Sequence, residues 1–288
     1  MRPIDLARLI TLAAIWGGSF IFMRVIAPVL GAIPTANSRV LIAGAVLSLY
    51  FLLTGYNPEW KKNWKQYLII GIIGSGIPFA LFAYAALSIP ASYEVILNST
   101  APLFGAIFSW VWLGDKMNGE KIIGLIIAAL GVSIVVNLGR ADLSTQFILA
   151  VLACLLAAIC YGLAGVYIKK FTNDLKPIAI AGGSQLMVGL FMLPFSATHS
   201  ADLSLVFNAK IILCILGLAL ICSMVAYLLY YQLIADIGPT KALTVTFLMP
   251  VFGMIWGAVF LKEIITLQMI FGTITILLGT SLVVKKHI

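Results

Sequence analysis

Two related stretches decide the fold of this chain. Residues 91–113 read ASYEVILNSTAPLFGAIFSWVWL, and residues 240–261 read TKALTVTFLMPVFGMIWGAVFL. Each stretch is mostly apolar over about 20 residues, which is the length that an α-helix needs to cross ~30 Å of hydrocarbon. Both stretches therefore predict a membrane-spanning helix, and their similarity predicts an internal duplication.

The duplication extends well beyond these two stretches. A constant offset of 148 residues aligns Pro102 with Pro250, Gly105 with Gly253, Leu113 with Leu261, Asp115 with Glu263, Gly124 with Gly272 and Gly131 with Gly279. An offset of 145 residues aligns Trp16-Gly17 with Tyr161-Gly162, Arg24 with Lys169 and Gly44 with Gly189. We therefore divide the chain into two related units, residues 1–140 and residues 141–288.

The composition is that of a protein whose main solvent is lipid. Of the 288 residues, 62% are hydrophobic and 10% are charged, whereas soluble domains have roughly 45–50% apolar and ~25% charged residues. In lipid every backbone polar group must be bonded within the protein, which permits helices or closed barrels only. Barrel strands would give alternating segments of ~10 residues. The apolar runs of this chain are about twice as long, so they favour helices.

Apolar runs occur at ten places along the chain. They lie at roughly residues 8–26, 34–53, 67–87, 91–113, 121–138, 146–168, 178–196, 210–233, 240–261 and 267–284. Each unit holds five runs, and an odd number of spans makes the second unit enter the membrane in the opposite orientation to the first. We therefore predict an all-α membrane protein of ten transmembrane helices, built as two inverted five-helix repeats with the substrate near the midplane between them.

The positive charge of the chain indicates its orientation. The formal net charge is +8, but the basic residues lie in short connections between apolar runs, not in the polar basic patch that nucleic acid binding requires. With a cytoplasmic N-terminus, 13 of the 18 Lys and Arg residues fall on the cytoplasmic side. Those on the outer side are Arg24, Arg140, Lys210 and Lys262, and Arg39 lies inside a predicted helix and counts for neither side. The positive-inside rule therefore predicts a multi-pass protein of the cell inner membrane with both termini in the cytoplasm.

No cofactor, metal or catalytic site is expected from the sequence. The four cysteines lie inside apolar runs without metal-ligand spacing, and the two histidines, His199 and His287, lie outside the runs. This pattern predicts small buried thiols without a disulfide, and no zinc site or histidine-based catalysis. The chain is accordingly predicted not to be an enzyme.

Four motifs in this order resemble the EamA-type branch of the drug/metabolite transporter superfamily. They are Trp16-Gly17-Gly18-Ser19-Phe20, Arg39-Val40-Leu41-Ile42-Ala43-Gly44, the segment from Asn98 to Asp115, and the segment from Leu248 to Glu263. The resemblance covers essentially the whole chain. It implies a secondary carrier with a central cavity lined by both halves, which often exports amino acids, metabolites or toxic compounds.

Glu94 and Asn98 are candidate substrate-binding residues of the fourth span. They are four residues apart, so both project from one face of a helix. An ionisable group in the membrane costs ~2.5–3.5 kcal/mol on insertion scales, which makes each one a functional candidate. Glu94 could bind an amine together with Asn98 or exchange a coupling proton. Alternatively, Glu94 is solvated near the outer interface or pairs structurally with Arg39.

Arg39 is the second charged candidate. Its guanidinium could bind a substrate carboxylate in bidentate fashion. The alternatives are an anchor that reaches the outer interface or a partner in an ion pair. Gln185, near the corresponding position of the second half, is predicted as a neutral hydrogen-bonding counterpart.

Several aromatic residues lie well inside the predicted helices and not at their ends. Tyr227 and Tyr231 share one helix face because they are four residues apart. A buried tyrosine hydroxyl needs a hydrogen-bond partner, which a cavity can provide. Packing within the helix bundle is the alternative role for each of them. The aromatic substrate-binding candidates are Trp16, Tyr84, Tyr161, Tyr227 and Tyr231.

Prolines and glycines recur at equivalent positions of the two halves. Pro102 and Pro250 are each expected to kink a helix, either as a matched pair of hinges or as static bends. The repeated glycines at seven-residue spacing are expected to let neighbouring helices approach closely. They are Gly124, Gly131, Gly272 and Gly279.

The sequence thus predicts a secondary-active transporter, most simply an exporter, of a small organic solute with amine or aromatic character. Coupling to protons and contact with membrane lipid are expected, and a monomer is compatible with the sequence. The alternative is a membrane-embedded enzyme or a lipid-handling protein, although Glu94 and Arg39 stand isolated and form no catalytic cluster. A channel is disfavoured, because no pore loop or ring of like charges is visible.

Overall fold

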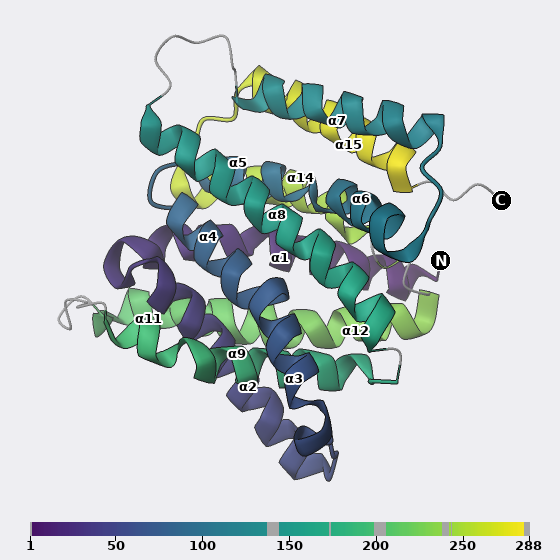
Figure 1. Cartoon of the computed structure of the whole chain (residues 1–288). Helices are drawn as coiled ribbons and strands as arrows, with labels where there is room; N and C mark the ends of the chain where they lie inside the picture. The colour runs from purple at the N-terminus through teal and green to yellow at the C-terminus, as the bar shows by residue number, and fades with distance from the viewer. Residues whose placement is uncertain are drawn as a thin grey trace.

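The computed structural model describes residues 2–136, 144–172, 174–198, 206–237, 242 and 244–284, and it leaves the side chains of Tyr231, Ile234 and Ala235 undescribed. These residues form a bundle of long helices (Figure 1). The charge-pattern positions Arg140, Lys241, Lys285 and Lys286, together with His199 and His287, lie outside the described residues.

The first half contains five membrane spans. The first two are single helices, and the third is interrupted by a π-helical segment, η1. The fourth consists of two short helices. In order the elements are α1 (Pro3–Leu30), α2 (Ala32–Thr54), α3 (Trp60–Gly71), η1 (Ile72–Gly76), α4 (Ile77–Ala85), α5 (Ala91–Asn98), α6 (Ala101–Leu113) and α7 (Gly119–Val136).

The second half repeats this plan. Its third span is again interrupted by a π-helical segment, η2, whereas its fourth span is one continuous helix among the described residues. In order the elements are α8 (Thr145–Phe171), α9 (Pro177–Ala197), α11 (Ala209–Leu216), η2 (Gly217–Val225), α12 (Ala226–Ile237), α14 (Val245–Leu261) and α15 (Leu267–Val284).

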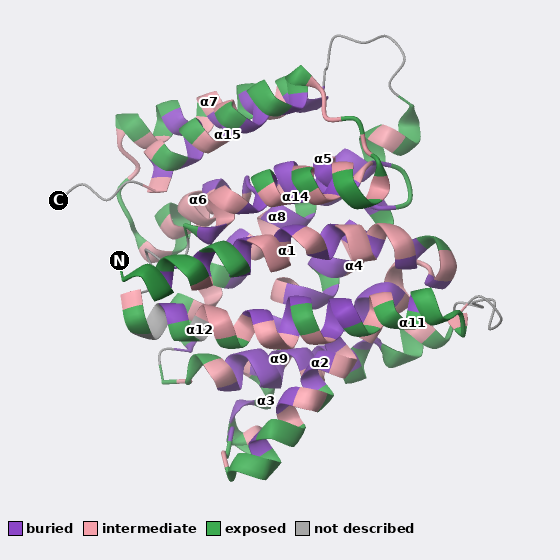
Figure 2. Cartoon of the chain, turned by 180° about the vertical axis from the view of Figure 1, so that it is seen from behind, coloured by how far each residue is buried: buried purple, intermediate pink, exposed green. Residues whose placement is uncertain are grey.

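Length and hydropathy agree with membrane insertion. Nine helical spans of the described residues are long and apolar enough to cross a membrane, and α14, with 17 residues, is a shorter apolar helix in the ninth position. The outer surface is strongly apolar, with Leu52 and Leu53 each 79% exposed, as suits contact with lipid. Buried residues gather on the inward faces of the helices (Figure 2). The predicted all-α membrane fold of two five-helix repeats is confirmed.

Helices of the two halves pack in pairs. α7 lies beside α15 (Figure 1), α2 packs on α9, α1 on α14, and α6 on α8. A Cβ added to Gly124 would lie 2.6 Å from the carbonyl oxygen of Gly279, and one added to Gly272 would lie 2.9 Å from that of Gly131. The predicted role of these four glycines in close helix packing is confirmed.

The same reciprocity holds between α2 and α9, at the centre of the bundle. A Cβ on Gly44 would meet the backbone nitrogen of Leu186 at 2.4 Å, and one on Gly189 would meet Cα of Leu41 at 2.8 Å. Leu41 and Leu186 are themselves related by the offset of 145 residues. The glycine of each half therefore packs on the same leucine position of the other half. These paired contacts relate the two halves by an approximate two-fold arrangement.

The two repeated prolines lie at different places in their spans, so the prediction that Pro102 kinks a helix is wrong. Pro102 lies in the first turn of α6, just after a break in the span, whereas Pro250 lies inside the continuous helix α14. At the break, the hydroxyls of Ser99 and Thr100 donate to the carbonyls of Ile96 and Leu97, each at 2.6 Å. The equivalent residues of the second half are Phe247 and Leu248, which have no hydroxyl to stabilise such a break.

Candidate functional site

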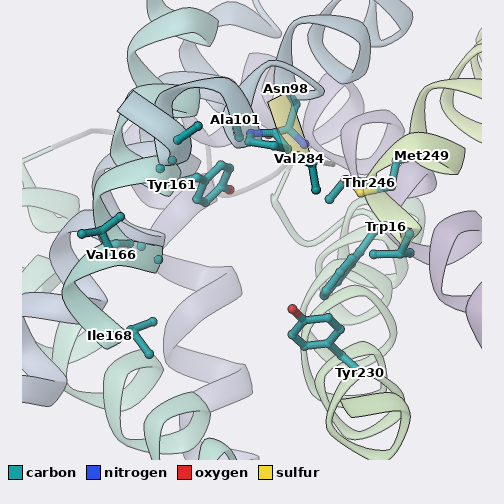
Figure 3. A pocket seen from close by; sticks show the side chains of 18 of the residues that line it. Trp16, Asn98, Ala101, Tyr161, Val166, Ile168, Tyr230, Thr246, Met249 and Val284 are labelled. Atoms are coloured by element: carbon teal, nitrogen blue, oxygen red, sulfur yellow. The ribbon is translucent and has the colours of Figure 1, made fainter. Parts of the chain in front are cut away.

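A cavity of about 970 Å³ lies between the two halves. Its volume is at the upper end of the ~300–1,000 Å³ that is typical of small-molecule sites. Trp16 of α1 and Tyr230 of α12 line one wall, and Tyr161, Val166 and Ile168 of α8 line the wall across from it (Figure 3).

The cavity opens at one end of the bundle. There it is lined by charged residues of the connection from α6 to α7 and of the end of α8, and by Val284 at the end of α15. The side chains of Asp115 and Lys169 at this mouth are 46% and 65% exposed. The charged residues of the mouth are Asp115, Lys116, Lys121 and Lys169.

The opposite end of the bundle is closed. Ile89 and Ala91, in and just after the connection between α4 and α5, are fully buried or nearly so. The carboxylate of Glu263 accepts hydrogen bonds from the backbone N–H of Ala91 at 2.7 Å and from the hydroxyl of Ser92 at 2.6 Å. The structure thus shows a transport-sized cavity with access from one side.

Arg39 of α2 lines the cavity and is only 5% exposed. Its Nε donates to Oγ of Ser223 at 2.9 Å, and its guanidinium carbon lies 3.8 Å from the centre of the Phe79 ring. Arg39 forms no ion pair with any described residue, Glu94 included. The structure shows neither alternative role, interfacial anchor or ion-pair partner. The side chain turns into the bundle, where no carboxylate of the described residues meets it.

Gln185 of α9 makes the comparable contact in the second half, one residue beyond Ser184, which the 145-residue offset aligns with Arg39. It is fully buried, and its Nε2 donates to Oγ of Ser75 at 3.2 Å and to the hydroxyl of Tyr227 at 3.4 Å. Ser75 lies in η1 and Ser223 in η2, separated by the same 148 residues that relate the repeats. Each half therefore sends a hydrogen-bond donor to a serine in the π-helical segment of the other half.

The aromatic candidates divide between the cavity and the outer surface. Trp16, Tyr161 and Tyr227 line the cavity, and the Trp16 ring lies 6.2 Å from the Tyr227 ring. Tyr84 is 40% exposed and is not among the lining residues. The side chain of Tyr231 lies outside the described residues.

The two candidates of the fourth span are separated by the structure. Asn98, the last residue of α5, lines the cavity, and its Oδ1 is buried without a hydrogen-bond partner among the described residues. Glu94, in the first turn of α5, is fully buried and does not line the cavity. Glu94 is thus neither solvated nor paired with Arg39, and both structural alternatives for it are wrong.

The family follows from comparison of the chain with known proteins. A model described as the EamA-like transporter family matches residues 6–137 and again residues 148–285. The chain belongs to the EamA-like transporter family. Because the two matches together cover most of its length, the predicted resemblance is confirmed, and the chain is a multi-pass membrane transporter and not an enzyme.

Curated relatives of this EamA-family chain are similar over most of their length. The uncharacterized transporter YvbV of Bacillus subtilis is 26% identical over 87% of this chain and 82% of its own. An uncharacterized transporter of Archaeoglobus fulgidus is 25% identical over 94% of this chain and 95% of its own. The uncharacterized inner membrane transporter YedA of Escherichia coli is 25% identical over 86% of this chain and 80% of its own.

A solved crystal structure supports the fold of the EamA-family chain. It superposes with a TM-score of 0.67 over 98% of this chain and 96% of the other, at 16% sequence identity. At that identity the similarity bears on the fold alone.

Within the described residues no three His, Cys, Asp or Glu side chains are grouped to hold a metal ion.

Sequence reasoning missed several residues of the cavity. Tyr230 lies three residues after Tyr227 and lines the cavity with it, with its ring 5.3 Å from that of Trp16. A helix brings residues three apart to one face as well as residues four apart, so the spacing contained this signal. Ser75, Phe79 and Ser223 carried no such signal, because the π-helical segments that place the serines are not readable from periodicity.

Proposed function

We propose that this EamA-family chain is a secondary-active exporter of a small organic metabolite in the cell inner membrane. It works by alternating access between its two inverted repeats, and both termini face the cytoplasm. The observation that carries the proposal is the cavity between the halves, which is open at one end and closed at the other. Alternating access needs a site of this kind, between repeats of opposite orientation.

The polarity of the cavity supports loading from the cytoplasm. Its mouth carries Lys116, Lys121 and Lys169 against one carboxylate, Asp115. Short connections rich in lysine mark the cytoplasmic side of membrane proteins. A cavity that opens on that side can take up a cytoplasmic solute and release it outside when the closed end opens.

The residues of the cavity suit a solute with polar and aromatic groups. Trp16, Tyr161 and Tyr227 offer ring faces, and Asn98 and Arg39 offer hydrogen-bonding groups. The approximate two-fold arrangement of the halves supplies a second state in which the packing of the two ends is exchanged. Of the described acidic residues near the closed end, Glu94 is our candidate for a coupling proton.

Counterflow in proteoliposomes tests the proposal, with Gly165 as the site of a blocking variant. Gly165 of α8 lines the cavity, and a Cβ added there would meet no atom within 4 Å. Gly165→Trp should therefore fill the cavity without breaking the helix packing and should abolish exchange of labelled amino acids, organic acids or amines. Gly165→Ala is the matched control and should exchange at the wild-type rate.

Equal exchange by both Gly165 variants would show that solute does not pass through this cavity. Absence of counterflow by the wild-type protein for every soluble solute, combined with movement of labelled phospholipid, would favour the lipid-handling alternative. Folding of each variant is checked by its elution as a single detergent-solubilised species.

A further inference from the structure

Arg39 carries a charge that the architecture of the bundle does not require. The guanidinium has five N–H donors, of which Nε is bonded to Oγ of Ser223 and Nη2 lies 3.4 Å from the carbonyl of Cys222. The side chain is 5% exposed, and among the described residues no carboxylate lies within ion-pair distance. Burial of an unneutralised charge is costly unless it is paired. Such a residue needs a reason other than packing.

The second half of the chain shows what packing alone requires at this place. Gln185 donates to Ser75 as Arg39 donates to Ser223, and each bond joins α2 or α9 to the π-helical segment of the opposite half. A neutral amide is therefore sufficient to hold this contact. The two contacts differ in the positive charge that Arg39 carries and Gln185 lacks.

The rest of the lining favours a negatively charged solute. Besides Arg39, the charged residues that line the cavity in the described part of the chain are Lys116, Lys121 and Lys169, against a single acidic residue, Asp115. Cations along a cleft with low-dielectric walls raise the local concentration of anions. The lysines also serve as orientation signals, so their presence alone does not indicate an anion site. We assign them the role of raising the local anion concentration, and we assign Arg39 the role of binding group.

Aromatic rings beside the guanidinium and across the cavity provide a surface for an apolar body. Phe79 lies under the guanidinium, and the ring of Tyr161 lies 6.5 Å from that of Phe79. Trp16 and Tyr230 form the wall across from Tyr161 (Figure 3). A carboxylate on Arg39 would leave the remainder of a small solute between these walls.

We infer that the transported solute is an organic anion whose carboxylate is bound by Arg39, and whose apolar or aromatic body lies between the rings of Trp16, Tyr161 and Tyr230. Arginine suits this role because its planar fork binds a carboxylate in bidentate fashion. The inference rests on the proposed transport function, since it assigns the chemistry of the solute in the same cavity.

Charge is the variable that tests the inference. Three solutes of similar shape serve as probes, namely 3-phenylpropanoate, its neutral amide and 3-phenylpropylamine, with benzoate as a second carboxylate. Binding to the purified protein in nanodiscs is measured by calorimetry, and transport by counterflow in proteoliposomes. The wild-type protein should bind and exchange the carboxylates and not the amide or the amine.

Arg39→Gln is the informative variant, because it removes the charge and keeps a hydrogen-bonding amide, the group that Gln185 uses toward Ser75 in the second half. The variant should fold, keep the bond to Ser223 and lose affinity for the carboxylates by about tenfold or more, as expected when a charged hydrogen bond is removed. Lys121→Gln is the control at the mouth of the cavity, and it should change affinity by much less than Arg39→Gln.

The outcomes separate this inference from the proposed function. Exchange of the amine or the amide in preference to the carboxylates, or unchanged carboxylate affinity in Arg39→Gln, would overturn the anion assignment and leave transport intact. Carboxylate binding that depends on Arg39 without any counterflow would support the anion site and overturn the transport function. Should Arg39→Gln fail to fold, the charge series on the wild-type protein still decides the assignment.

Discussion

Glu94 is a carboxylic acid buried in the bundle, and it forms no ion pair among the described residues. It is fully buried, and neither carboxyl oxygen has a hydrogen-bond partner among the described residues. A carboxyl group in such a place can exchange a proton only when water reaches it. Proton exchange at Glu94 would therefore accompany opening of the closed end.

At the residue scale we predict that Glu94→Gln abolishes gradient-driven accumulation of solute while the protein still folds. Glutamine keeps the volume of glutamate but cannot ionise. Exchange of internal solute for external solute should persist, but its rate should no longer depend on pH. Counterflow at several pH values measures this dependence. Asp115→Asn, which neutralises an exposed carboxylate at the mouth, is the control and should accumulate solute normally.

The Glu94→Gln variant has two other informative outcomes. Loss of affinity for solute would indicate that Glu94 binds a cation, in conflict with the anion assigned to the cavity. Accumulation, affinity and pH response equal to those of the wild type would mean that Glu94 is structural.

At the scale of elements, α6 and α14 end in the same way but contact different partners. Gly114 and Lys262, which follow these helices, both have a left-handed backbone, with φ of 73° and 57°. The carboxylate of Glu263 accepts three hydrogen bonds from Ala91 and Ser92 at the start of α5. Its counterpart Asp115 is 46% exposed, with Lys169 at 4.0 Å. At the closed end, Glu263 therefore links the end of α14 to the start of α5. Among the described residues no such link is seen for Asp115 at the open end.

The sequence could predict that Asp115 and Glu263 are equivalent, but it could not predict this difference. The local backbone is the same at both places, as the bonds from Asp115 N–H to Ser109 O and from Glu263 N–H to Gly257 O show, at 3.2 and 3.1 Å. The partners of each carboxylate are set by how the helices pack around it, and the counterparts of Ala91 and Ser92, Pro239 and Thr240, lie outside the described residues.

We predict that Glu263→Gln loosens the closed end. An amide cannot offer two carboxylate oxygens, and it loses the favourable interaction of a negative charge with a helix N-terminus, worth about 1 kcal/mol, or about a fivefold change in population. A cysteine placed at Ile89, which is fully buried in the closed end, should be modified several-fold faster from the outer side in this background. Asp115→Asn should leave the rate unchanged, and an equal rate in all three proteins would contradict the role of the cap.

At the scale of the whole molecule, the spans and the duplication could be predicted because both are written into the chain directly. Hydropathy over ~20 residues marks a helix that lipid must surround, and a constant offset marks a repeat whatever the repeat contacts. Arg39 and Gln185 could be predicted as site residues because they are polar residues near corresponding places in two apolar runs. Their serine partners could not be predicted, because π-helical segments arise from the packing of the bundle.

The orientation in the membrane is the property of the whole molecule that decides between loading from the cytoplasm and loading from outside. The start of α1 and the end of α15 lie on the same side of the bundle (Figure 1), and that side also carries the lysines of the cavity mouth. If the positive-inside rule holds, the cavity opens to the cytoplasm in this conformation. The reactivity of a single introduced cysteine toward an impermeant reagent shows on which side of the membrane it lies. The native cysteines, Cys154, Cys160, Cys214 and Cys222, are first replaced.

We predict that a cysteine at Ser109, which lines the cavity, reacts with a membrane-impermeant maleimide in inside-out vesicles and not in whole cells. A cysteine at Lys62 should behave in the same way, because this residue lies on the predicted cytoplasmic side. A cysteine at Asn208, on the predicted outer side, should react in whole cells. The reverse pattern at all three sites would invert the protein and turn the proposed exporter into an importer. Reaction of Ser109→Cys from the outside with Lys62→Cys still cytoplasmic would mean that the mouth of the cavity is at the other end of the bundle, against the lysine distribution on which cytoplasmic loading depends.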